Sequence, residues 1–468
     1  MSHAVRIWAL VAALASAGAL AACGGEGAPS GHAAPVRRQP PKPPEPRALV
    51  RVVDGDTGHP VSGAAVAAAG EKMRTGRDGT VALRVNDRSK LRLTVSAKRY
   101  GSRTVRIDLG HGLRSEVRIW QPALQWPIYG ATRARTQAHP ALRVRPPFRF
   151  VWHRSFAGLI EFPAMVWNGV AYVNVYGGNL RAISMRTGHV LWRRRVGTRM
   201  ASSPGLDPER GILVTTSMSP GYVNVISMAT GRIRWRYYTG RAEPSPVIRD
   251  GVAYFGAANG NVYALDLDRR KPRWIYHGGV KVTSSPALVG NRLFYGDYAG
   301  RVFALDARTG RRIWTGSAGS RVYGTVAVAK GRVFVPSVFS GLSALSARTG
   351  RLLWRIPVAD YVYSSPAFFR NRVYFGTFTW RVVCADARSG RIIWSRPTYG
   401  AVSGAVEVVA GVVYAATVRE RMYAYDWRSG RLVWRFPHGA YVPVSGSGSR
   451  LLIHGKKEIW AVEGRRPR

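Results

Sequence analysis

Residues that could carry out catalysis are few in this sequence and are widely spaced. Four carboxylates, Glu161, Glu243, Asp297 and Asp360, lie near the starts of short predicted strands or in the loops between them. Such oxygen ligands could hold calcium, but one or two of them at the mouth of a channel would make a thin site, because calcium takes about six to eight oxygens. The ten histidines form no H-x-x-x-H pair, which argues against a zinc centre.

The two cysteines indicate different roles. Cys23 ends the sequence LAAC, which follows Arg6 and an apolar stretch at 7–19. This pattern resembles a bacterial lipobox, which implies cleavage before Cys23 and acylation of its thiol. A signal peptide with an unmodified cysteine is the alternative. Cys384 stands where other repeat units have alanine, and we interpret it as a small buried strand residue.

Composition limits the partners and the location of the chain. The 468 residues are 46% hydrophobic, which excludes wholesale disorder, and the net charge of +45 favours anionic partners such as acidic lipid or phosphate-bearing wall polymer. No other apolar stretch approaches the length of a membrane span. We expect a monomeric, membrane-anchored, extracytoplasmic lipoprotein that binds no nucleic acid, because the export signal removes it from the cytoplasm.

The N-terminal third is expected to contain a signal peptide (1–23), a proline-rich tether (24–47) and a small domain (48–120). Short alternating runs with Asp-Gly and Thr-Gly turns in the small domain predict an antiparallel β-sandwich of about seven strands. The motifs DTG…PV…GA, DG and KRYG resemble the carboxypeptidase regulatory-like domain, a transthyretin- or Ig-like sandwich that is not itself a peptidase. Asp54 and Asp56 could be calcium ligands there, but we interpret both as turn caps.

The remainder of the chain is dominated by an internal repeat. Strings such as DARTGRRIW, SARTGRLLW, DARSGRIIW and DWRSGRLVW recur, and their tryptophans fall about every 40 residues. Eight tryptophans share this period: Trp152, Trp192, Trp235, Trp274, Trp314, Trp354, Trp394 and Trp434. Four short strands in each unit are typical of one blade of a β-propeller.

The repeat predicts an all-β, eight-bladed propeller over 148–463, preceded by a linker (121–147) and followed by a basic tail (464–468). The last unit has only three strands, and the orphan strand at 148–152 is expected to supply the fourth and close the ring. The aspartates of the repeat should cap the turn between the third and fourth strands, where Gly310 and its equivalents supply a positive φ. The tryptophan four residues later should seal neighbouring blades.

The A-x-D-x-x-[TS]-G-x-x-x-W pattern resembles the quinoprotein (PQQ) repeat and its tryptophan-docking motif. Eight-bladed members of that family include PQQ-dependent alcohol dehydrogenases and a non-enzymatic outer-membrane assembly lipoprotein that scaffolds a β-barrel insertase. The dehydrogenases need a metal ion on the quinone, an aspartate base and commonly two adjacent cysteines, and this sequence has no Cys-Cys pair. We therefore expect no cofactor and no enzymatic activity, with a PQQ- and calcium-dependent dehydrogenase as the alternative.

Propeller topology sorts the loops into two faces. The turns between third and fourth strands carry the candidate basic face: Arg308, Arg311, Arg348, Arg351, Arg388, Arg391, Arg428 and Arg431. The opposite loops carry the candidate partner face: Tyr237, Tyr298, Phe339, Tyr361, Tyr363, Trp380, Tyr399 and Tyr441. The arginines are expected to bind anionic lipid or wall polymer, and the aromatic residues a protein or glycan partner in the envelope. Solvated turn arginines and tyrosines packed between blades are the alternative. A glycan- or wall-polymer-binding protein remains a second functional alternative.

Overall fold

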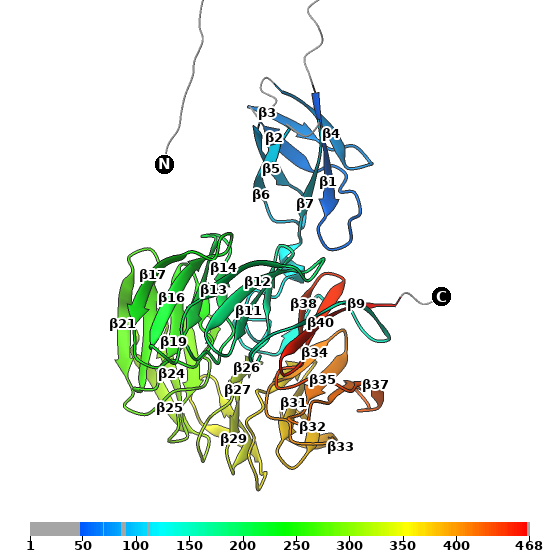
Figure 1. Ribbon diagram of the computed structural model, residues 1–468. Coiled ribbons are helices and arrows are strands. Elements are labelled where there is room, and N and C mark those ends of the chain that lie inside the picture. Colours follow the sequence, from blue (N-terminus) through cyan, green and yellow to red (C-terminus); the bar gives the residue numbers. More distant parts are fainter. Residues whose placement is uncertain (1–46, 69, 86–89, 110–112, 466–468) are drawn as a thin grey trace, which may run out of the picture. The chain divides into compact units, whose positions relative to one another are not determined.

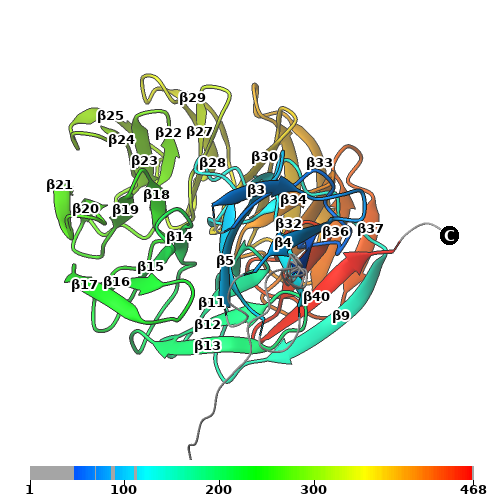
Figure 2. The ribbon, with the colours of Figure 1, turned by 90° about the horizontal axis from the view of Figure 1, so that it is seen from above.

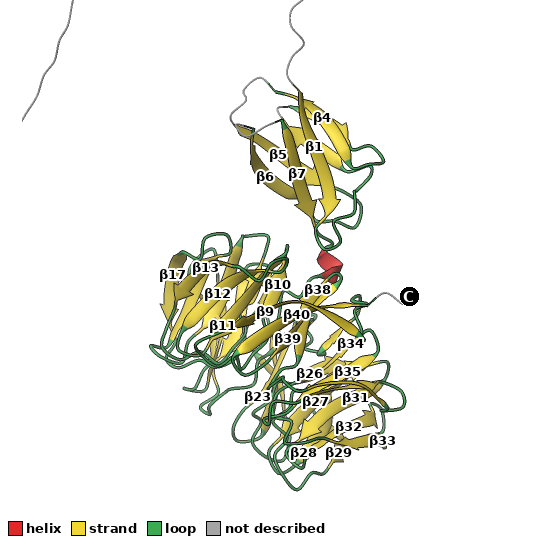
Figure 3. Cartoon of the chain, turned by 45° about the vertical axis from the view of Figure 1, so that its right-hand side comes forward, coloured by secondary structure: helices red, strands yellow, loops and turns green. Residues whose placement is uncertain are grey.

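The computed structural model describes residues 47–68, 70–85, 90–109 and 113–465, and these are almost entirely strand and turn (Figures 1 and 3). The single helical element within them is a 3₁₀ turn, η1 (Pro122–Leu124). No described helix is long and apolar enough to span a bilayer. The predicted signal peptide, Cys23 and all of the tether except Arg47 lie outside the described residues. The all-β class is confirmed.

Two small sheets precede the repeats, in the orders β4-β1-β7 and β3-β2-β5-β6. Their strands are β1 (Arg47–Asp54), β2 (Ala65–Ala68), β3 (Glu71–Arg74), β4 (Thr80–Arg84), β5 (Lys90–Ser96), β6 (Arg103–Asp108) and β7 (Arg114–Ile119). Alternating apolar residues such as Val50, Leu93 and Val117 form one buried cluster between them. The expectation of wholly antiparallel pairing is wrong for β1 and β7, which are parallel, because the intervening chain crosses to the second sheet before β7 returns beside β1.

Eight sheets follow one another around a ring in the described residues from Phe148 to Gly464 (Figure 2). We call them blades 1 to 8 in chain order and label their strands A to D from the inside outward. In A to D order, blade 1 comprises β10 (Met165–Trp167), β11 (Val170–Val175), β12 (Asn179–Ser184) and β13 (Val190–Arg195), and blade 2 comprises β14 (Gly205–Asp207), β15 (Ile212–Thr216), β16 (Tyr222–Ser227) and β17 (Ile233–Tyr238). Blade 3 comprises β18 (Val247–Arg249), β19 (Val252–Gly256), β20 (Asn261–Asp266) and β21 (Lys271–His277), and blade 4 comprises β22 (Ala287–Val289), β23 (Arg292–Gly296), β24 (Arg301–Asp306) and β25 (Arg312–Ser317).

The other four blades follow the same order of strands. Blade 5 comprises β26 (Ala327–Ala329), β27 (Arg332–Ser337), β28 (Gly341–Ser346) and β29 (Leu352–Ile356), and blade 6 comprises β30 (Ala367–Phe369), β31 (Arg372–Thr377), β32 (Arg381–Asp386) and β33 (Ile392–Pro397). Blade 7 comprises β34 (Val406–Val409), β35 (Val412–Ala416), β36 (Met422–Asp426) and β37 (Leu432–Phe436), and blade 8 comprises β38 (Val444–Ser447), β39 (Arg450–His454), β40 (Glu458–Gly464) and β9 (Phe148–Ser155). The last strand, β9, pairs antiparallel with β40 over its whole length. The segment expected to complete the last sheet therefore does so, and the first and last repeats share one blade.

The tryptophans of the D strands connect neighbouring blades. Six indoles lie on the glycine of the next blade's C–D turn: Trp152 on Gly188, Trp192 on Gly231, Trp274 on Gly310, Trp314 on Gly350, Trp354 on Gly390 and Trp394 on Gly430. Each of these six indole nitrogens also donates a hydrogen bond of 2.9–3.4 Å to a carbonyl of that same turn. A Cβ at position 310 would lie 2.7 Å from the Trp274 ring, so glycine is needed there for space as well as for its φ of +75°.

Two tryptophans of the repeat pack differently, for reasons visible in the neighbouring blade. Blade 3 has Arg270, with φ +59°, where the glycine would face Trp235. Blade 8 has no C–D turn because its D strand comes from the start of the repeats. Trp434 instead packs edge-on against Phe148 of β9, with ring centroids 5.0 Å apart. The weaker repeat in blade 3 and the split blade 8 are thus local variations of one interface.

A one-residue irregularity in every D strand turns the tryptophan inward. In blade 6, Cys384 pairs with Trp394 and Ala385 pairs with Ile392, so Ile393 has no partner on strand C. The same register shift precedes the tryptophan in each of the other seven blades. A β-bulge of this kind leaves the extra residue unpaired and re-aims its neighbour. Ile393 is consequently 37% exposed, while the adjacent Trp394 is 6% exposed.

Residues 121–147 do not form the linker that was expected. Backbone carbonyls of Pro127, Arg133, Ala134, Thr136 and Gln137 accept hydrogen bonds from the innermost strands of blades 2, 4, 5, 6 and 7, respectively, at 2.7–3.1 Å. Trp126 pairs with Val166 of blade 1, and the short strand β8 (Ala138–His139) pairs in parallel with β34. The segment therefore satisfies the free inner edges of the A strands, which need partners once buried. We call residues 121–147 the axial segment.

We expect substitutions of the adjacent residues Trp394 and Ile393 to differ in their effect on stability, because only Trp394 packs against the next blade. Trp394→Ala should lower the free energy of unfolding by about 3–5 kcal/mol, because a buried indole and its contact with blade 7 are lost. Ile393→Ala should change it by less than about 0.5 kcal/mol, because the bulged side chain is exposed. Urea unfolding followed by tryptophan fluorescence measures both values. Equal effects of the two substitutions would contradict a stabilising role for the contact between Trp394 and blade 7.

Candidate functional site

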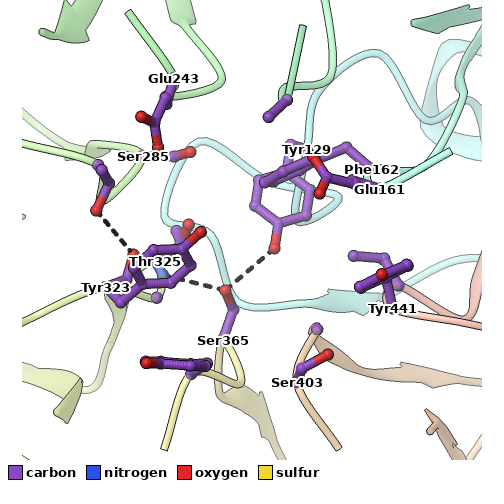
Figure 4. A pocket seen from close by; sticks show the side chains of 16 residues that line it. Tyr129, Glu161, Phe162, Glu243, Ser285, Tyr323, Thr325, Ser365, Ser403 and Tyr441 are labelled. Carbon is purple, nitrogen blue, oxygen red and sulfur yellow. Dashed lines mark hydrogen bonds between the residues drawn. The ribbon is translucent and has the colours of Figure 1, made fainter. Parts of the chain in front are cut away.

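The eight D–A connections meet at one end of the ring and enclose a pocket of about 310 Å³ (Figure 4). Every connection between successive blades contributes at least one lining residue: Glu161 and Phe162; Ala201; Glu243; Thr283 and Ser285; Tyr323, Gly324 and Thr325; Tyr363 and Ser365; Ser403 and Gly404; Tyr441 and Val442. A Cβ on Gly404 would approach the Tyr441 carbonyl to 2.1 Å, so this glycine allows two connections to meet. The pocket is therefore a product of ring closure.

The axial segment contributes Tyr129 to the lining of this pocket. The Tyr129 hydroxyl donates to Ser365 Oγ at 3.1 Å, and burial raises its pKa to about 12. Arg135 behind it is fully buried and donates to the carbonyls of Tyr129, Ser245 and Pro286 at 2.6–3.0 Å. Burial lowers the pKa of Arg135 to about 9, so it stays charged at neutral pH. This stretch was expected to be a linker, although its apolar residues Trp126, Ile128 and Tyr129 are a signal that could have indicated burial.

Two of the four candidate carboxylates come together in the pocket, and two do not. Glu161 and Glu243 both line it. Burial raises the pKa of Glu161, and the nearby charge of Glu243 raises it further. Asp297 is buried under its own turn, where it accepts from Arg301 Nε at 2.7 Å, and Asp360 accepts from the backbone of Tyr361. Asp297 and Asp360 therefore serve local turn structure.

Rings from blades 4 to 6 form a continuous cluster that extends outward from the pocket. Neighbouring centroids lie 4.7–6.3 Å apart among Tyr298, Tyr323, Tyr361, Tyr363, Phe339 and Phe378. Two further exposed rings, Trp380 and Tyr399, both lie under the guanidinium of Arg419, at 4.6 and 5.0 Å. We call these eight rings the aromatic face. Side-chain cations accompany it, as is typical of protein-binding surfaces rich in aromatic residues and arginine.

The remaining two residues of the expected partner face lie elsewhere. Tyr441 lines the pocket. Tyr237 is on β17 of blade 2 and packs against Tyr263 of β20, the C strand of blade 3, with centroids 6.4 Å apart. Tyr237 is therefore not a loop residue of the partner face but a D-strand residue of blade 2 that packs against strand C of blade 3.

Two aromatic residues of this face are held in backbone conformations that side chains rarely adopt. Trp380, 43% exposed, has φ +61° at the residue before strand C, where blades 3 and 4 have Gly260 and Gly300 with φ +82° and +79°. Phe339, 56% exposed, also has φ +61°. A left-handed conformation costs a residue with a Cβ roughly 1–2 kcal/mol. Strained backbone residues occur preferentially at functional sites, which makes Phe339 and Trp380 candidate binding residues.

The arginines of the candidate basic face are all exposed at the C–D turns of blades 4 to 7. The turns themselves are held by aspartate: Asp306 Oδ1 accepts from the backbone of Arg308 and Thr309 and from the Thr309 hydroxyl at 2.8–3.0 Å. These bonds outweigh burial and lower the pKa of Asp306. Asp386 and Asp426 have the same contacts, so the interpretation of these aspartates as turn caps is confirmed.

The other residues singled out in the sequence have structural surroundings. Asp54 caps its turn by accepting from the backbone of Thr57 at 2.8 Å and also from the Tyr100 hydroxyl. Asp56 is not a turn cap, because its Oδ1 accepts instead from Ser447 of blade 8 at 2.9 Å. Burial raises the pKa of Asp56 to about 6. Cys384 is buried in β32, which raises the pKa of its thiol to about 12.

Comparison with known proteins identifies the family to which the repeats belong. The family model described as outer membrane protein assembly factor BamB matches residues 149–277, 176–335, 258–359 and 339–464, which together span two thirds of the chain. The chain belongs to this family. No curated protein matches it, so the family assignment rests on the repeats and their fold.

Solved structures with the same fold come from both branches of the PQQ-repeat proteins. BamB from Moraxella catarrhalis is 16% identical, with a TM-score of 0.59 over 68% of this chain and 99% of its own. A quinohemoprotein alcohol dehydrogenase from Comamonas testosteroni is 14% identical, with a TM-score of 0.61 over 73% and 81%. A europium-containing methanol dehydrogenase is 13% identical, with a TM-score of 0.59 over 73% and 90%. At these identities the likeness establishes a β-propeller and does not choose between the two branches.

The pocket of this family member fits a quinone cofactor poorly. Pyrroloquinoline quinone carries three carboxylates, and the charged residues of the lining are both acidic: Glu243, which is paired with Arg241 and Lys281, and Glu161, which has no cationic partner among the described residues and would repel it. Among the described residues, no group of three His, Cys, Asp or Glu side chains is placed to hold a bridging cation. The only cysteine of the described chain, Cys384, is buried in a strand. The residues that would hold such a quinone are therefore not assembled at this end of the ring.

Substitutions of Trp380 test whether its exposed ring contributes to the stability of the protein. Trp380→Gly should leave the free energy of unfolding within about 1 kcal/mol of the native value, because relief of the left-handed strain offsets the loss of the ring contacts. Trp380→Ala should be less stable than Trp380→Gly by about 1 kcal/mol, because it retains the Cβ. Urea unfolding measures both variants. An alanine variant as stable as the glycine variant would contradict a strained turn.

Proposed function

We propose that the chain is a lipid-anchored, extracytoplasmic scaffold that binds a partner protein during envelope assembly and catalyses no reaction. In this proposal Cys23 carries the lipid and residues 24–47 are the tether. The transthyretin-like sandwich (48–120) then precedes an eight-bladed propeller (148–463) with its axis occupied by residues 121–147. The family match and the display of Phe339 and Trp380 on the aromatic face support this function. The partner would be an assembly component such as a β-barrel insertase.

The aromatic face is the surface that we propose for the partner. Tyr399 and Phe339 are more than half exposed, at 51% and 56%, and their burial on binding would supply the apolar anchors that dominate protein interfaces. Arg419 and Arg421, which lie over Tyr399 at 5.0 and 4.7 Å, would meet carboxylates or carbonyls at its rim. Strain at Phe339 and Trp380 would be retained because the displayed rings are used.

The basic face has a separate proposed role toward anionic lipid or wall polymer. Its eight arginines repeat on four consecutive blades, and the net charge of +45 would strengthen their attraction to such a surface. An electrostatic association of this kind weakens steeply with ionic strength. It would orient the propeller, whereas the aromatic face would select the partner.

Site-specific crosslinking tests the partner surface. With a photoreactive benzoylphenylalanine at position 339 or 399, we expect one discrete crosslinked envelope protein in cells, and Trp380→Gly should weaken that product at least several-fold. The probe at Leu353, which is 39% exposed on the outer strand β29, is the matched control. Capture of the same protein with equal yield from position 353 would contradict the aromatic face as the docking surface.

Cofactor titration tests the non-enzymatic part of the proposal. Addition of pyrroloquinoline quinone with calcium should not shift the melting temperature of the purified chain and should not produce dye-linked alcohol oxidation, because Glu161 in the pocket opposes an anionic cofactor. A quinoprotein dehydrogenase treated in parallel is the positive control. A saturable one-to-one shift with turnover would overturn the proposal and establish the dehydrogenase alternative.

A further inference from the structure

The pocket on the propeller axis contains a carboxylate that lacks a counter-ion. Glu243 pairs with Arg241 at 2.7 Å and with Lys281 at 3.4 Å. Glu161 lines the same pocket, and in the described part of the chain no cationic side chain pairs with it. In a chain of net charge +45, an enclosed carboxylate without a cation is unexpected on charge alone. The negative charge of Glu161 is therefore not neutralised by the protein's own cations and could be neutralised by a ligand.

The walls of the pocket are suited to a cation with an apolar body. Five rings line it, those of Tyr129, Phe162, Tyr323, Tyr363 and Tyr441 (Figure 4). The faces of aromatic rings attract organic cations, and cages of such rings recognise ammonium groups. Ser403 also lines the pocket, and its hydroxyl is buried without a hydrogen-bond partner. The volume of about 310 Å³ is at the lower end for small-ligand sites.

The electrostatics of the lining favour a cation over an anion. Burial and the charge of Glu243 both disfavour the ionised form of Glu161 and raise its pKa. An ammonium group beside Glu161 would relieve that cost, whereas an anion would increase it. Among the described residues no three metal-ligating side chains converge here, which argues against a metal ion as the ligand. One carboxylate among rings suits a single ammonium group.

We propose that the axial pocket binds an organic ammonium group, through an ion pair with Glu161 and cation–π contacts with the surrounding rings. The group could belong to a free amine or to a lysine side chain of another protein, since the recognised chemistry is the same. The pocket shares Tyr323 and Tyr363 with the aromatic face, but Glu161 is not a residue of that face, so a substitution of Glu161 tests this inference separately.

Calorimetric titration of the purified full chain tests this proposal. Pentylammonium should bind saturably and raise the melting temperature, while pentanol and pentanoate, at matched ionic strength, should do neither. Glu161→Gln should weaken pentylammonium binding at least tenfold and leave the unliganded melting temperature within a few degrees, since Glu161 has no ion pair to lose. Glu209→Gln, with the same charge change at the A–B turn of blade 2, should bind like the native protein.

A second probe separates the two sources of the ammonium group. Binding of Nα-acetyl-lysine methylamide as tight as that of pentylammonium would assign the pocket to a lysine side chain, and binding of pentylammonium alone would assign it to a free amine. Equal binding of pentanol or pentanoate, or unchanged binding in Glu161→Gln, would overturn the proposal. The crosslinking experiment at positions 339 and 399 leaves Glu161 intact, so failure of one proposal is distinguishable from failure of the other.

Discussion

The contact between an indole and the glycine of the next blade is the interaction on which the rest of the propeller depends. The bulge before each tryptophan turns the ring toward the neighbouring blade, and glycine leaves the space that the ring fills. Because Trp152 belongs to β9 and lies on Gly188 of blade 1, the same contact joins the ends of the repeat. Repetition of one interface at nearly constant geometry closes the ring and brings eight equivalent connections together at its axis.

Closure creates a second requirement, because the innermost strands of all blades present unpaired edges to the axis. The axial segment meets this requirement with backbone hydrogen bonds to blades 1, 2, 4, 5, 6 and 7, while the Arg133 side chain bonds Ile248 of blade 3 at 2.9 Å. Its buried Arg135 is held by three carbonyls instead of a carboxylate. The segment therefore occupies the centre of the ring and contributes Tyr129 to the pocket at one end. Closure of the ring therefore accounts both for the buried axial segment and for the pocket.

The two ends of the ring have different chemistry for reasons of backbone geometry. The C–D turns are short and similar, with aspartate or serine at the capping position, so arginine beside the glycine is presented to solvent. The B–C turns differ from blade to blade, and Trp380 and Phe339 take left-handed conformations there. Uniform turns serve the architecture, whereas the varied and strained turns of blades 5 and 6 carry the surface that we propose for a partner.

The sequence by itself determined the repeat, the period of the tryptophans, the turn role of Asp306 and its equivalents, and the need for an N-terminal strand to complete the last sheet. These features are local or periodic, so spacing alone reveals them. Only the tertiary structure decided that residues 121–147 fill the axis, that β1 and β7 are parallel, that Asp56 bonds Ser447 and that Glu161 and Glu243 share a pocket. Those outcomes join residues tens to hundreds of positions apart, and they follow from ring closure and from the pairing of buried edges, which no local pattern records.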